Sequence, residues 1–129
     1  MLHHISFSVS DLKRSAGFYD SILGPLGYRR VCEGNDFVGY GTEEYKDKFA
    51  LKSRVDNVNK PSVGFHLAFA APDRNSIDEA YNEGIQNGGT DNGKPGLREH
   101  YGPSYYAAFL IDPDGYEVEL VINSNEVDI

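Results

Sequence analysis

The stretch HISFSVSDL, residues 4 to 12, contains the pattern that decides the fold. The bulky side chains of Ile5, Phe7 and Val9 alternate with small or polar ones, which is the spacing of a strand with two different faces. His4 lies, together with two serines, on the strand face that carries the small or polar side chains, called the small face below. Apolar residues then recur at helical spacing, so a helix is expected to follow the strand.

The same pattern returns in HLAFAAPDRN, residues 66 to 75. His66 again shares a strand face with small residues, here alanines, and a helical spacing again follows. Placing His66 over His4 also superposes identical residues at four further points: Phe7 with Phe69, Asp11 with Asp73, Tyr19 with Tyr81 and Gly27 with Gly89. The chain therefore reads as an internal repeat of one strand–helix unit.

Short apolar segments complete each copy of the repeat. Three follow the first helix, and SYYAAFLI and YEVELVI form a hairpin around the turn DPDG in the second copy. The segment GGTDNGKPG, residues 88–96, is expected to be a long turn region. The sequence thus predicts an α+β fold of two βαβββ modules, 1–56 and 62–124, within a single domain 1–129, with the polar stretch DNVNKPS between them.

Composition narrows the classes of partner. The chain has 129 residues, enough for one domain with a buried core, and a net charge of −8, which argues against nucleic acid or an anionic membrane as a partner. Cys32 is the only cysteine and cannot form a disulfide within the chain, which predicts a reducing compartment. The sequence has no basic leader and no long apolar run, so we expect a cytoplasmic protein.

The small strand faces suggest a metal site. If the sheets curve, His4 and His66 line the concave side, and the last strand adds a carboxylate there, because Glu117 and Glu119 lie opposite its apolar residues. Two imidazoles and a carboxylate suit a divalent first-row metal and leave positions open for substrate. The alternative is that these are hydrogen-bonded histidines and solvated glutamates without a metal.

Three motifs resemble the vicinal oxygen chelate superfamily, which includes glyoxalase I, extradiol dioxygenases, fosfomycin-resistance thiol transferases and bleomycin-resistance proteins. They are HISFSVSDLKRSAGFY, GFHLAFAAPDR and FLIDPDGYEVEL. The resemblance selects His4 rather than His3, together with His66 and Glu119, as ligands of Zn, Ni, Mn or Fe. It also implies a cup of curved mixed sheets and a homodimer, with the site either within one chain or shared between two.

One departure from the family pattern bears on the reaction. Glyoxalase I has a further glutamate on the last strand of its first module, whereas the corresponding segment here, KFALKSRV at 48–55, has no carboxylate. This puts the classical methylglyoxal–glutathione isomerisation in question. Extradiol enzymes are usually longer than this chain, which argues against ring cleavage. The sequence has no pattern typical of a phosphonate site, which argues against fosfomycin modification.

The resemblance implies a metal-dependent lyase, isomerase or transferase that acts on a small oxygen-rich or thiol-conjugated metabolite by stabilising an oxyanion. The alternatives are a metal-free small-molecule binding protein similar to bleomycin-resistance proteins, and a decayed site without activity. Further candidates surround the final hairpin. His100, Tyr101 and Tyr105 are predicted catalytic residues, and Arg98, Tyr106 and Glu117 are predicted to bind substrate.

Overall fold

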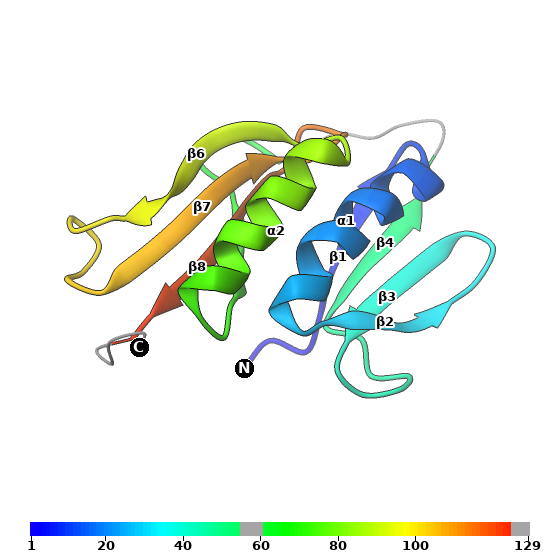
Figure 1. The fold of residues 1–129 in the computed structure, drawn as a ribbon. Helices are drawn as coiled ribbons and strands as arrows, with labels where there is room; N and C mark the ends of the chain where they lie inside the picture. Colours follow the sequence, from blue (N-terminus) through cyan, green and yellow to red (C-terminus); the bar gives the residue numbers. More distant parts are fainter. Residues whose placement is uncertain (55–60, 125–129) are drawn as a thin grey trace.

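The computed structural model describes residues 1–54 and 61–124 and contains two modules with the same order of elements (Figure 1). The first module comprises β1 (Ile5–Val9), α1 (Leu12–Leu26), β2 (Arg29–Glu33), β3 (Phe37–Gly41) and β4 (Phe49–Ser53). The second comprises β5 (Leu67–Ala70), α2 (Arg74–Gln86), β6 (Thr90–Leu97), β7 (Tyr105–Ile111) and β8 (Glu117–Asn123). The predicted α+β fold of two βαβββ units is confirmed. The expected module boundary at position 56 lies outside the described residues.

Each module forms a four-stranded mixed sheet of the same topology. The strand orders are β1-β4-β3-β2 and β5-β8-β7-β6, with the first pair parallel and the others antiparallel. Helices α1 and α2 lie side by side and contact each other (Figure 1). In the described part of the chain the two sheets stay separate and do not close into one barrel.

The segment expected to be a turn region is strand β6, so that expectation was wrong. β6 pairs antiparallel with β7, with register shifts on both sides of Gly93. Gly93 has a φ of 146°, which an L side chain rarely adopts, and this allows the irregular backbone. Pro95 is tolerated because β6 is an edge strand. The turn-forming residues therefore mark bulges in a strand.

The bulky strand faces pack under the helices and form the core. Fully buried side chains from both sheets and both helices meet there, among them Val9, Ile22, Leu51, Ile77, Leu110 and Leu120. Burial of this apolar surface leaves the small face of each sheet, which carries the histidines, on the side away from the helices. Among the described residues, no helix is both long and apolar enough to span a membrane.

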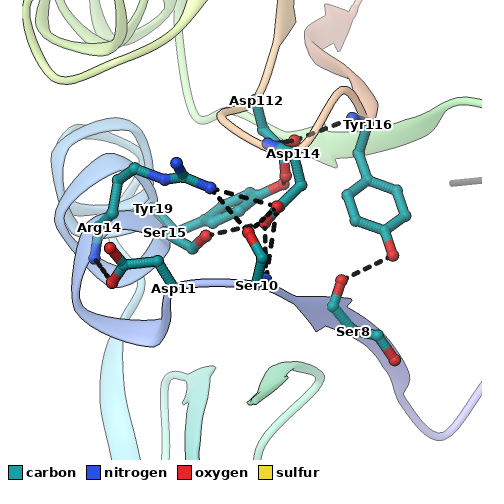
Figure 2. A network of polar contacts seen from close by, with 9 residues as sticks. All are labelled: Ser8, Ser10, Asp11, Arg14, Ser15, Tyr19, Asp112, Asp114 and Tyr116. Carbon is teal, nitrogen blue, oxygen red and sulfur yellow. Dashed lines mark hydrogen bonds and ion pairs between the residues drawn. The ribbon is translucent and has the colours of Figure 1, made fainter. Parts of the chain in front are cut away.

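The turn between β7 and β8 joins the two modules (Figure 2). Asp112 is buried and accepts hydrogen bonds from the Tyr19 hydroxyl at 2.7 Å and from the backbone N–H of Tyr116 at 2.8 Å. The Tyr116 hydroxyl donates in turn to the carbonyl of Ser8 at 2.8 Å. Burial raises the pKa of Asp112. These contacts attach the second module to the start of the first.

Candidate metal centre

His66 and Glu119 meet on the face of the second sheet that points away from the helices. His66 lies directly before β5, and the parallel register places Ala68 of that strand opposite Glu119 of β8. The Nε2 atom of His66 lies 2.8 Å from the Oε1 atom of Glu119. The Glu119 side chain is 2% exposed, whereas that of His66 is 48% exposed. The pair thus combines a buried carboxylate with an imidazole that solvent can reach.

Tyr105 holds the other oxygen of this carboxylate. Its hydroxyl donates a short hydrogen bond to Oε2 of Glu119. Burial, followed by the neighbouring Glu119, raises the pKa of Tyr105 to about 12. Tyr105 therefore keeps its proton at neutral pH and acts as a hydrogen-bond donor to Glu119.

Two side chains border the pair on the sheet surface. The ring of Phe109 meets that of His66 edge-on, with centroids 6.2 Å apart, and the Arg98 guanidinium lies 5.4 Å above the Phe109 ring. Arg98 also donates hydrogen bonds to the carbonyls of Lys94 and Gly96. Phe109 was not predicted as a site residue, although strand alternation places it on the same face as Tyr105.

The predicted catalytic residues form an aromatic row. The rings of His100 and Tyr101 lie 4.1 Å apart, and those of Tyr101 and Tyr105 lie 5.2 Å apart. Tyr101 is 60% exposed. The row therefore runs from Glu119, through Tyr105, to the protein surface. Only Tyr105 of the three has a hydrogen bond to Glu119 among the described contacts.

The remaining predicted substrate-binding residues lie elsewhere. Tyr106 is on the helix side of β7, where its hydroxyl donates to Asp78 of α2 at 2.5 Å. This placement turns it away from Glu119, because adjacent strand residues face opposite sides. Glu117 accepts a 3.4 Å hydrogen bond from the amide of Asn92. It lines a cavity of about 220 Å³ at the start of β8.

His4, the third predicted ligand, lies on the first module. It contacts His3 through their Nδ1 atoms at 2.8 Å. It lines a cavity of about 450 Å³ together with Ser6, Cys32, Asp36, Phe37, Asp47, Ala50, Lys52 and Arg54. Within residues 1–54 and 61–124, no three histidine, cysteine or carboxylate side chains are close enough to hold one metal ion. A single chain thus brings together two of the three predicted ligands.

The repeat explains what the first module lacks. Ser6 is paired with Ala50 in the β1–β4 register, and the equivalent pair in the second module is Ala68 with Glu119. Ala50 is therefore the structural counterpart of Glu119. The two histidines match across the repeat, but the carboxylate is present only in the second copy, which leaves the donor set at two imidazoles and one carboxylate.

Comparison with known proteins identifies the family. A model of the Glyoxalase/Bleomycin resistance protein/Dioxygenase superfamily matches residues 1–120, and the chain belongs to this superfamily. A lactoylglutathione lyase of Salmonella typhimurium is 33% identical over 93% of this chain and 90% of its own length. A probable lactoylglutathione lyase of Synechocystis is 30% identical over 98% of both. Within the superfamily, the chain is therefore a glyoxalase-like member.

Solved structures agree with this placement. A glyoxalase/bleomycin resistance protein from Albidiferax ferrireducens superposes with a TM-score of 0.79 at 29% identity, covering 94% of this chain and 97% of that one. A glyoxalase-related enzyme from Fulvimarina pelagi superposes with a TM-score of 0.73 at 19% identity, covering 95% and 88%. At 19% identity, the similarity to the Fulvimarina pelagi enzyme supports only a shared fold.

Proposed function

We propose that this protein is a metal-dependent enzyme that acts on a small oxygen-rich or thiol-conjugated metabolite. The observation that carries the proposal is the pairing of buried Glu119 with half-exposed His66, whose side chains lie 2.8 Å apart. An ionised carboxylate is rarely buried in a protein unless it is paired or binds a metal. Relatives named lactoylglutathione lyase support a lyase or isomerase reaction, and the transferase type stays open.

The metal would be held by His66 and Glu119 of one chain and His4 of a second copy. The support for a shared site is that His4 lines a cavity of the other module and is not clustered with these ligands within the described residues of one chain. A homodimer that faces the first module of one copy toward the second module of the other completes the set. Zn, Ni, Mn and Fe all suit these donors. When bound, such an ion stabilises negative charge that develops on substrate oxygens.

The surrounding residues have separate roles in this proposal. Tyr105 orients the Glu119 carboxylate through its hydrogen bond, as partners of ligand side chains do in other metal sites. His100 and Tyr101, which continue the aromatic row toward solvent, are the candidates for proton transfer. Arg98 borders the same face and would contact an anionic part of the substrate.

A metal-free small-molecule binding protein is the second candidate. It is favoured by one observation, which is that both oxygens of Glu119 have protein partners, His66 and Tyr105. In that case this face of the sheet would bind a ligand through shape and hydrogen bonds alone.

The two candidates are separated by metal analysis of tag-free protein purified without chelator. The proposal predicts about one metal ion per chain in the wild type and loss of the ion in His66→Ala, with Tyr106→Phe as a matched control that keeps it. Tyr106 suits this role because it lies on the helix side of β7. A wild type that is empty and does not take up added Zn, Ni, Mn or Fe would favour the binding protein.

A further inference from the structure

We propose that Lys52, assisted by Arg54, forms an oxyanion subsite that binds a carboxylate or phosphate group of the ligand. Both residues line the cavity of about 450 Å³ that also contains His4. The inference rests on the proposed function, because it assigns a chemical class to the ligand of that centre. It concerns the first module, whereas Glu119 and His66 belong to the second.

The sheet register places Lys52 on the face of the histidine. In the parallel β1–β4 pair, Ser6 lies opposite Ala50 and Ser8 lies opposite Lys52. Alternation along the strands puts these residues on the same side as His4. Because Ala50 has a short side chain at the position between His4 and Lys52, the floor of the cavity is open between imidazole and ammonium.

Within residues 1–54 and 61–124, neither Lys52 nor Arg54 forms a salt bridge. Several other surface cations are paired at short distance, namely Arg14 with Asp114, Arg29 with Glu44, Arg30 with Asp20 and Glu33, and Lys46 with Glu43. Around Lys52 and Arg54, the described part of the chain places no carboxylate within 4.0 Å. The Arg54 guanidinium donates a hydrogen bond to the carbonyl of Ser53 at 3.1 Å.

Two acidic residues, Asp36 and Asp47, line the same cavity, and their negative charges could oppose the binding of an anion. Asp36 lies near Ser53, whose backbone N–H donates to the Asp36 carbonyl at 2.8 Å. Asp47 lies against Gly39 on the side of Cys32. Neither carboxylate forms a salt bridge with Lys52 or Arg54, so these two acids do not occupy the donors that a ligand would use. A protein with a net charge of −8 repels anions in general, so such a pair is needed to bind one.

Spacing along the strand adds a constraint on the ligand. Ser8, the register partner of Lys52, lies four residues beyond His4, which corresponds to about 13 Å of strand. The lysine side chain shortens this separation but does not remove it. The ligand is therefore elongated, with its anionic group several bonds from the part that reaches His4.

The test is a titration of the isotope-labelled full chain, followed by amide NMR at constant ionic strength. Inorganic phosphate and succinate are the two probes, and sodium chloride is the blank. We expect saturable shifts of the amides of Ser8, Lys52 and Ser53 with at least one probe, and the probe that binds tells phosphate from carboxylate. Lys52→Gln should weaken binding about tenfold or more, because it removes a charged donor.

Three variants make the result specific. Lys13→Gln removes the same charge from the exposed surface of α1 and should leave the affinity unchanged. His66→Ala should bind the anion as the wild type does, and Lys52→Gln should retain the metal ion. Loss of metal binding and loss of anion binding can therefore be observed separately, so the metal proposal and the subsite are tested independently. The subsite is refuted if neither probe shifts these amides more than sodium chloride does, or if Lys52→Gln binds like the wild type.

Discussion

Removal of the Asp114 side chain should destabilise the module junction. This side chain is 6% exposed and accepts hydrogen bonds from the Ser10 hydroxyl at 2.5 Å and the Ser15 hydroxyl at 3.2 Å (Figure 2). Arg14 also donates to it at 3.2 Å, but that side chain is 47% exposed and contributes little. Asp114→Ala leaves the fully buried Ser15 without this acceptor.

The magnitude follows from the two serines. A hydrogen bond to a charged acceptor contributes about 1.5–3 kcal/mol, so losing both should lower the free energy of unfolding by about 3 kcal/mol. For a chain of this size, that corresponds to a decrease of roughly 10 °C in Tm. Asp114→Asn keeps the size and one acceptor oxygen, and should cost about half as much.

The assay is urea unfolding of the wild type and both variants, followed by circular dichroism, with the free energies obtained by linear extrapolation. The variants should differ in the midpoint while the slope with urea stays the same. If Asp114→Ala unfolds within about 1 kcal/mol of the wild type, the junction does not hold the modules together and the reasoning from Figure 2 is wrong.

Three further predictions concern the junction, the metal centre and the helix contact. Burial raises the pKa of Asp112 in the native state above its ordinary value of 3.8. The native state therefore binds this proton more tightly than the unfolded state does, and the contribution of Asp112 to stability falls as the pH rises above 3.8. Asp112→Asn should remove that dependence in urea unfolding at several pH values, and an unchanged profile would contradict it. Tyr105→Phe removes the hydrogen bond to Glu119 and should weaken Zn²⁺ binding about tenfold in competition with a chelator, with unchanged affinity as the contrary result. A methyl group on Gly84 would lie 2.7 Å from Ile22 in α1, so Gly84→Ala should destabilise by about 1–3 kcal/mol. Gly17→Ala, with open space around it, should be neutral or stabilise by up to about 1 kcal/mol, and equal effects of the two in thermal unfolding would refute the packing argument.

The fold was predictable because the alternation around Phe7 and Phe69 marks the buried face of each first strand. Strand β6 was missed because its glycines and proline are typical of turns, and only pairing with β7 shows that they form bulges. Such long-range pairing overrides local preference, and no single segment contains that information.

Part of the predicted ligand arrangement follows from strand alternation. Alternation along single strands was enough to place His66 and Glu119 on one face, and their contact agrees with it. The same rule argues against having both Tyr105 and Tyr106 at one site, since neighbours on a strand face opposite ways. The position of His4 relative to His66 and Glu119 depends on how the two modules pack through α1 and α2. The alternation along single strands does not predict this packing.

The metal content of a mixed dimer shows whether the metal centre is shared between two copies of the chain. One chain carries His4→Ala and the other His66→Ala, with different tags for purification. A site shared between copies predicts about one ion per mixed dimer, because His66 and Glu119 of the first chain still face an intact His4 of the second. Each variant alone should hold none. A mixed dimer as empty as the two separate variants, beside a wild type that binds metal, would contradict the shared centre.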